Sequence, residues 1–350
     1  MRRRLLWVMA LLGLLVLAVG AAAWYFVGTA SGRAVLLAQA AREAVAGGGG
    51  AEFDGLRVFL CGTGSPLASP GRAQPCVAVT AGTALYVVDA GAGSHATMQL
   101  QRQPTRHLRA VLVTHLHTDH VTGIPDFNLM SWVDGRPAPL EVYGPDGVDR
   151  LVGGFNEALA PDRSYRVAHH GMRLLPPKLG VMVPVRIEPG IVHEGDGLTI
   201  TAFAVDHSPV EPAFGYRFDY RGRSVVVSGD TVVTESLEQA AAGADLLLHD
   251  VLSLPIVRAV EEAALAADRP RVAQIFADIP SYHAHASELG GLALRTGVRM
   301  LAVYHYVPPP QNAVMEMVYR SELPDDTILT RDGMVFELPA ASTEIRVVEP

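Results

Sequence analysis

Three histidines and one aspartate are crowded into a single short segment of this chain. They are His115, His117, Asp119 and His120, and only Thr114 separates them from the apolar run 110–113. Residues two apart cannot share a helix face, but their side chains can converge where a strand runs out into a loop. Neutral imidazole and carboxylate are the ligands that borderline divalent cations such as zinc prefer. The segment therefore predicts one part of a metal site.

Three later residues are placed where further ligands would be needed. His207 follows the alternating run 201–205, Asp230 follows the apolar run 224–228, and His305 follows the apolar run 300–304. Each comes at the C-terminal end of a predicted strand, which is where side chains of different strands meet in enzymes built on a sheet. We therefore expect these three residues to join the first cluster.

The segments that must position these residues alternate between short strands and helices. The predicted strands cover residues 56–61, 76–80, 84–89, 110–114, 198–205, 224–228 and 246–249. The predicted helices cover residues 147–159, 235–242, 256–267, 287–296 and 312–319. The early strands follow one another closely, whereas helices separate the later ones. This mixture favours a layered α/β domain with both hairpin and crossover connections.

At this level of detail the chain resembles a known family, the metallo-β-lactamase superfamily, in the branch that contains ribonuclease Z and zinc-dependent arylsulfatase-like proteins. The matching motifs are His-x-His-x-Asp-His at 115–120, Gly-Thr-Gly-Ser-Pro at 62–66, Asp-Ala-Gly at 89–91, Val-Asp-His at 205–207, Phe-Gly-Tyr at 214–216, Ser-Gly-Asp-Thr at 228–231 and His-Tyr-Val-Pro at 305–308. They run from about residue 56 to about residue 338. The resemblance implies a four-layer αββα sandwich.

The resemblance also implies a cofactor of two divalent metal ions, with zinc as the expected metal. In the family pattern one ion is held by His115, His117 and His207, the other by Asp119, His120 and His305, and Asp230 bridges the two. A hydroxide shared by the two ions would be the nucleophile. Two cations about 3.5–4 Å apart can orient such a nucleophile and neutralise charge on a phosphoryl or sulfuryl centre.

The catalytic residues implied by the resemblance are Asp119, His283 and Asp250. His283 opens the last long helix and would act as the general acid that protonates the leaving group, and Asp250 would orient it. Histidine suits this role because its pKa lies near the working pH. Two alternatives remain open: His283 is a structural helix cap, or His285 takes over its role.

These residues indicate a metal-dependent hydrolase of ester bonds, and we expect a sulfate or phosphate ester of a small molecule as the substrate. The net charge is −8, and the region 146–189 contains only scattered arginines and the single Lys178. Nucleic acid is therefore not expected as a partner, because phosphate backbones are bound through clustered positive charge. The alternatives are a ribonuclease Z-like enzyme that processes tRNA 3′ ends, a lactonase or β-lactamase-type hydrolase, and a non-catalytic membrane-tethered binding protein.

The N-terminal segment has the composition of a membrane anchor or of a signal peptide. Arg2, Arg3 and Arg4 precede an uncharged stretch over residues 5–30, which is long enough to span a bilayer. The small residues 21–23 resemble a signal cleavage site. We expect residues 1–30 to be the anchor or signal, 31–50 a helical and glycine-rich tether, and 51–345 the hydrolase domain. The domain would then lie in the periplasm or outside the cell, held at the inner membrane or secreted.

The two cysteines leave their redox state open. Cys61 and Cys76 are too few for a disulfide framework, which favours buried free thiols, although in an oxidising compartment they could close a short loop. The oligomeric state is open as well, and a homodimer is compatible with the sequence.

Overall fold

The computed structural model describes residues 2–45 and 53–350, and the chain divides into the units Met1–Gly49 and Gly50–Pro350. The first unit contains α1 (Arg2–Ala23), the π-helix η1 (Trp24–Gly28) and α2 (Ala30–Val45). Within it, the 23 residues Leu6–Gly28 have a mean hydropathy of 2.5 and are exposed, so this segment is long and apolar enough to cross a membrane. A signal sequence has the same properties. The predicted glycine run 47–50 lies outside the described residues.

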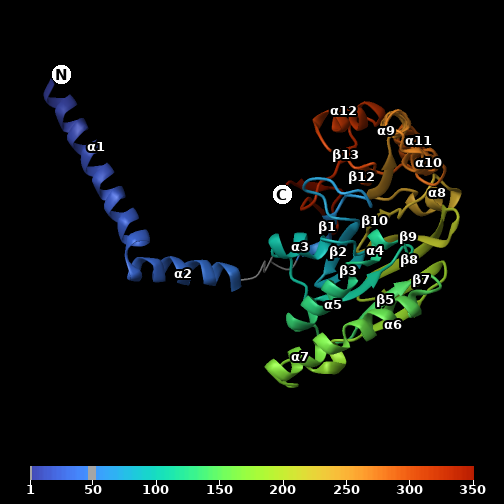
Figure 1. Ribbon diagram of the computed structural model, residues 1–350, viewed down its shortest axis with the longest axis horizontal. Helices are drawn as coiled ribbons and strands as arrows, with labels where there is room; N and C mark the ends of the chain where they lie inside the picture. The colour runs from blue at the N-terminus through green and yellow to red at the C-terminus, as the bar shows by residue number, and fades with distance from the viewer. Residues whose placement is uncertain (1, 46–52) are drawn as a thin grey trace. The chain divides into compact units, whose positions relative to one another are not determined.

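The second unit is built on two β-sheets (Figure 1). The first has the strand order β15-β14-β1-β2-β3-β4-β5-β6, and the second has the order β13-β12-β11-β10-β9-β8-β7. The strands of the first sheet are β1 (Phe53–Gly62), β2 (Cys76–Gly82), β3 (Ala84–Val88), β4 (Leu108–Leu112), β5 (Leu140–Gly144), β6 (Met182–Arg186), β14 (Val335–Pro339) and β15 (Arg346–Val348). Those of the second are β7 (Gly190–Gly195), β8 (Leu198–His207), β9 (Val210–Tyr220), β10 (Arg223–Val227), β11 (Leu246–Leu252), β12 (Met300–Val307) and β13 (Ile328–Leu329).

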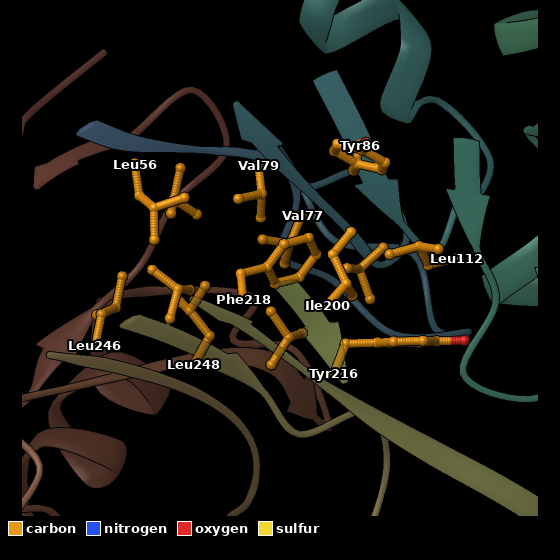
Figure 2. Packing of buried hydrophobic residues seen from close by; sticks show 14 of the residues in the cluster. Leu56, Val77, Val79, Tyr86, Leu112, Ile200, Tyr216, Phe218, Leu246 and Leu248 are labelled. Atoms are coloured by element: carbon orange, nitrogen blue, oxygen red, sulfur yellow. The ribbon is translucent and has the colours of Figure 1, made fainter. Parts of the chain in front are cut away.

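A hydrophobic core fills the space between the two sheets. Figure 2 shows Leu56, Val77, Val79, Tyr86 and Leu112 of the first sheet facing Ile200, Tyr216, Phe218, Leu246 and Leu248 of the second. The alternation along β2 explains how this core forms, because every second residue of a strand points to the same face. Val77 and Val79 face the second sheet, whereas Cys76 and Ala78 point to the other side.

Helices cover the outer face of each sheet (Figure 1). The first sheet packs against α3 (Ser94–Leu100), α4 (Thr118–Val121), α5 (Ile124–Val133) and α6 (Val148–Ala158). The second packs against α8 (Glu235–Ala241), α9 (Leu254–Ala266), α11 (Ala286–Thr296) and α12 (Ala313–Glu322). The remaining helices are α7 (Ala160–His170), η2 (Pro177–Leu179), α10 (Pro270–Asp278) and η3 (Ile279–Ser281). The predicted four-layer αββα sandwich is confirmed.

The expectation of free thiols is wrong, because Cys61 and Cys76 form a disulfide. The two cysteines lie on the neighbouring antiparallel strands β1 and β2, where Gly62 is paired with Cys76. Their Cα atoms are therefore 5.0 Å apart, within the range that a disulfide spans. The strand pairing, which two isolated cysteines in a sequence do not reveal, brings them together.

Parallel pairing brings the segments that follow several strands to one edge of the sandwich. In the first sheet β3, β4 and β5 run parallel to one another, and in the second sheet β10, β11 and β12 do so. The C-terminal ends of parallel neighbours lie at the same edge of a sheet, so the segments that follow these strands are close in space.

Candidate metal centre

Seven histidine and aspartate side chains meet at this edge, between the two sheets. His115 and His117 lie in the loop after β4, and Asp119 and His120 belong to the short helix α4 that follows. The second sheet contributes His207 at the end of β8, Asp230 after β10 and His305 near the end of β12. These are the seven positions expected from the sequence to hold metal ions, and the structure brings all of them together.

The carboxylate of Asp230 lies in the middle of the cluster. Its Oδ2 is 3.2 Å from Nε2 of His305 and 3.3 Å from Nε2 of His120. The same oxygen is 4.0 Å from Nε2 of both His115 and His207. One carboxylate oxygen thus faces four imidazoles, which is the position that a bridging ligand between two cations would occupy.

A bulge in β12 directs His305 toward the cluster. The pairing of β12 with β11 joins Tyr304 to Asp250 and Tyr306 to Val251, so that His305 is left out of the register. Its φ of 45° is unusual for a residue with a side chain. Bulges re-aim single side chains, and they occur often beside active sites.

Several buried polar atoms of the cluster lack a partner among the described residues. Oδ2 of Asp119, Nε2 of His120 and Nε2 of His305 are buried and form no hydrogen bond there. Oδ2 of Asp119 nevertheless lies 3.5 Å from each of the two imidazole nitrogens. Unpaired buried polar atoms are costly, and a cation between the three atoms would satisfy all of them at once. The donor set of imidazoles and carboxylates therefore fits a divalent metal ion such as zinc.

Full or partial removal from water favours the neutral form of three of the histidines, which is the form that binds a cation. It lowers the pKa of His115 well below its usual value, because the buried ring is removed from water and lies next to other imidazoles. Burial also lowers the pKa of His117 and of His207. Imidazoles that are neutral at pH 7 present a free lone pair to a metal ion.

The other two histidines of the cluster respond to the neighbouring carboxylates. Burial opposes the charged form of His120, but Asp230, Asp89 and Asp119 together raise its pKa well above the usual value. The pKa of His305 is raised as well, mainly by Asp230, against the effect of burial. The raised pKa values favour the protonated form of both rings, so a metal ion that binds there competes with protons.

Asp89 orients one histidine of the cluster, and sequence reasoning did not include it among the site residues. This buried carboxylate accepts hydrogen bonds from the backbone N–H of Thr114 at 2.9 Å and from its hydroxyl at 2.9 Å. Its Oδ2 also lies 2.8 Å from Nδ1 of His120. When Nδ1 carries the proton, Nε2 of His120 faces the cluster with its lone pair. The only sequence signal was the Asp-Ala-Gly motif at 89–91.

The backbone oxygen of Tyr282 orients His207 in the same way. It lies 2.9 Å from Nδ1 of His207 and accepts a hydrogen bond from it, so that Nε2 points toward Asp230. The ring of Tyr282 packs edge-on against that of His207, with a centroid distance of 5.2 Å. The turn before α11 therefore fixes one candidate ligand.

Gly229 is required for the turn that presents Asp230. Its φ is +66°, a conformation that residues with side chains rarely adopt. A Cβ atom at this position would also lie 2.7 Å from the backbone oxygen of Phe214 on the neighbouring strand. The glycine allows β10 to turn sharply, so that the next residue reaches the cluster.

His283 lies beside the cluster and is paired with a buried carboxylate. Its Nδ1 is 2.9 Å from Oδ2 of Asp250, and both side chains are buried. The ring of His283 stacks on that of His305 at a centroid distance of 5.5 Å and lies 5.1 Å from that of His207. In contrast, Nε2 of His285 faces the backbone oxygen of Pro280 at 3.1 Å. The structure thus brings His283, and not His285, next to the candidate metal ligands.

Comparisons with known proteins agree with this architecture. A family model described as a beta-lactamase superfamily domain matches residues 85–306. A ribonuclease Z of Mycobacterium bovis is 38% identical over 256 residues, which cover 72% of this chain and 86% of the relative. A ribonuclease Z of Mycolicibacterium paratuberculosis is 37% identical over the same shares of the two chains. A metallo-beta-lactamase fold protein from Bacillus subtilis superimposes with a TM-score of 0.57 and 18% identity over 81% of this chain and 99% of its own. The short form of human tRNase Z gives a TM-score of 0.57 and 17% identity over the same shares.

The chain belongs to the metallo-β-lactamase superfamily, in the branch that contains ribonuclease Z. It is accordingly a metal-dependent hydrolase of ester bonds, and the family implies divalent metal ions for the cluster described above. Both points confirm what the motifs predicted.

The expected substrate was wrong. The sequence favoured a sulfate or phosphate ester of a small molecule and argued against nucleic acid, but the matching relatives are named ribonuclease Z. The argument against nucleic acid used the net charge and the scattered basic residues of one segment, 146–189. A value of −8 sums the whole surface of 350 residues, whereas a substrate meets only the surface around one site.

Proposed function

We propose that this protein is a ribonuclease Z-like endonuclease that hydrolyses a phosphodiester bond of RNA. The observation that carries the proposal is the 38% identity to a ribonuclease Z over 86% of that protein's length. The convergence of the six other candidate ligands around Asp230 supports it, because the relationship would mean little without a complete site.

The proposed cofactor is a pair of zinc ions. One would be held by His115, His117 and His207, the other by Asp119, His120 and His305, with Asp230 between them. This donor set of neutral imidazoles and carboxylates is the one that zinc prefers. Bound zinc would polarise the phosphoryl group and make a water molecule acidic enough to attack near neutral pH.

The proposed role of His283 is to protonate the leaving group. Its Nδ1 donates to Asp250, which leaves Nε2 to hold the proton that the departing ribose oxygen needs. Burial opposes the ionisation of Asp250, but His249 and His283, whose Nδ1 atoms each lie 2.9 Å from one of its oxygens, lower the pKa of this carboxyl group. An ionised carboxylate at this position stabilises the protonated imidazole and fixes the direction of its ring.

Cleavage of a tRNA precursor with a 3′ trailer by the purified full-length protein tests the proposal. We expect trailer release that stops when a chelator removes the metal and returns when zinc is added. Asp230→Asn should abolish cleavage, whereas Asp196→Asn, the same change in an exposed turn, should not. Metal-loaded protein that leaves this RNA intact while it hydrolyses an activated phosphodiester would contradict the RNA assignment.

We also propose that the N-terminal segment anchors the protein in the inner membrane, with residues 51–345 as a hydrolase domain on the outer side and 31–50 as the tether. The exposed apolar segment Leu6–Gly28 after three arginines supports this orientation. The disulfide between Cys61 and Cys76 supports an oxidising compartment. A signal peptide is the second candidate, and it would give a secreted enzyme.

The two proposals together place the RNA substrate outside the cytoplasm. Alkaline extraction of membranes distinguishes an anchor, which stays in the pellet, from a cleaved signal, which leaves a soluble protein with a new N-terminus near Trp24. Reporter fusions at the C-terminus show on which side of the membrane the hydrolase domain lies. A domain found in the cytoplasm would contradict the proposed localisation and leave the RNA proposal standing.

A further inference from the structure

A third histidine, His249, lies buried in the strand that supports the general-acid pair. It belongs to β11, whose other residues are apolar except for Asp250, and it has no exposed surface. Its Nε2 has no hydrogen-bond partner among the described residues. An imidazole in such a position costs free energy relative to a hydrophobic side chain, because part of its polar surface is left unpaired. The fold alone does not require a histidine there.

The contacts of His249 all lead to Asp250. Its Nδ1 donates to the backbone oxygen of Asp250 at 2.8 Å and lies 2.9 Å from the carboxylate oxygen Oδ1, which accepts no hydrogen bond of regular geometry among the described residues. The other carboxylate oxygen, Oδ2, lies 2.9 Å from Nδ1 of His283. The backbone N–H of Asp250 donates to the hydroxyl of Ser228 at 3.1 Å. The carboxylate thus has one imidazole beside each oxygen, and the hydrogen bond runs from His283 to Oδ2.

We infer that His249 is a positioning residue for the reaction, which directs Oδ2 of Asp250 at His283. This inference rests on the proposed role of His283 as the general acid. If the imidazole beside Oδ1 is removed, this oxygen loses the positive N–H group at its side, and the buried carboxylate either rotates toward another donor or takes up a proton. Both changes withdraw a charged acceptor from Nδ1 of His283, so that its ring is no longer fixed with Nε2 toward the leaving oxygen.

The step that depends on this arrangement is the transfer of one proton. As water attacks phosphorus and gives up a proton to the solvent, the bond from phosphorus to the leaving oxygen breaks, and that oxygen takes the proton from Nε2 of His283, which regains one from the solvent after the reaction. A good leaving group such as p-nitrophenolate departs without the proton, whereas phenolate and a ribose alkoxide need it. Replacement of His249 should therefore lower the rate of ester hydrolysis, and the loss should be larger for esters with a poorer leaving group.

The test compares the p-nitrophenyl and phenyl esters of thymidine 5′-phosphate with the zinc-loaded full-length protein. For His249→Leu we expect a loss of about 10- to 100-fold in kcat on the phenyl ester, a part of the effect of general acid catalysis. The p-nitrophenyl ester should lose less than about 3-fold. His249→Asn places an amide N–H near the position of Nδ1 and should restore most of the rate on the phenyl ester. His249→Gln puts its amide near Nε2 and should not.

Equal losses on both esters would overturn the inference, since they indicate a general structural effect. So would full activity of His249→Leu on the phenyl ester, or equal activity of the Asn and Gln variants. If the leucine variant does not fold, the Asn and Gln pair decides alone, because both keep a polar side chain there. Both esters are independent of RNA, so a failure to cleave the tRNA precursor would count against the proposed function and leave this comparison valid.

Discussion

Replacement of Asp89 by asparagine should weaken metal binding without disturbing the backbone. Asp89 has a φ of 55°, in the left-handed region where asparagine is tolerated as well as aspartate. Its two oxygens accept from the N–H and the hydroxyl of Thr114 and from Nδ1 of His120. An amide nitrogen in place of Oδ1 would face the backbone N–H of Thr114, which is also a donor. In place of Oδ2 it would favour the tautomer of His120 with the proton on Nε2, which cannot bind a cation.

The size of the effect follows from these contacts. Loss of the partner that orients a ligand typically reduces metal affinity 10- to 100-fold, which corresponds to about 1.4–2.8 kcal/mol. A buried donor left without an acceptor costs a further ~1–3 kcal/mol of folding free energy. We therefore expect weaker zinc binding in Asp89→Asn together with a lower melting temperature of the metal-free protein.

Competition with a chromophoric chelator measures the zinc affinity of each variant. Asp196→Asn is the matched control, because Asp196 has a φ of 52° and lies exposed in the turn between β7 and β8. It should bind zinc like the unmodified protein. The reasoning is refuted if Asp89→Asn melts at a lower temperature but retains the original zinc affinity.

Three further predictions concern other parts of the domain. The affinity for zinc should fall as the pH is lowered, because the three neighbouring carboxylates raise the pKa of His120 and below that pKa the metal must displace a proton. Titration calorimetry at several pH values measures this affinity, and an affinity that does not change with pH would contradict the prediction. Replacing Cys61 and Cys76 by serine should remove about 3 kcal/mol of unfolding free energy, since the disulfide spans 15 residues; urea denaturation should show a similar loss for the reduced protein. Gly229→Ala should shift Asp230 and lower the zinc content below two equivalents, at a backbone cost of about 1–2 kcal/mol; a full complement of zinc would refute the steric argument.

The positions of the candidate metal ligands could be predicted because a single rule covers most of them. His115 follows β4, Asp230 follows β10, and His207 stands at the end of β8. The ends of neighbouring strands meet in a sheet, so residues far apart in the chain can be assigned to one site once the strands are recognised. The bulge that re-aims His305 is not visible in the sequence, because it depends on the pairing with β11.

Other features depend on pairings that the sequence does not specify. The role of Asp89 exists only because β3 and β4 are parallel neighbours, which brings it next to Thr114. The strand β9 was not predicted, since Glu211, Pro212 and several charged residues interrupt its apolar pattern. It forms because it pairs with β8 over nearly its whole length and with β10 on its other side. Tertiary context thus outweighs local propensity there.

The seven side chains of the cluster come from both halves of the sandwich, His115 to His120 from the first sheet and His207, Asp230 and His305 from the second. In the proposed arrangement each ion takes two ligands from the first sheet and depends on the second sheet for the rest. Metal would consequently bind only when the two sheets are packed correctly against each other. Its binding free energy would then stabilise the native state and not the unfolded chain. An organism short of zinc would then accumulate a less durable enzyme as well as an inactive one, so that supply of the ion would govern the lifetime of the protein.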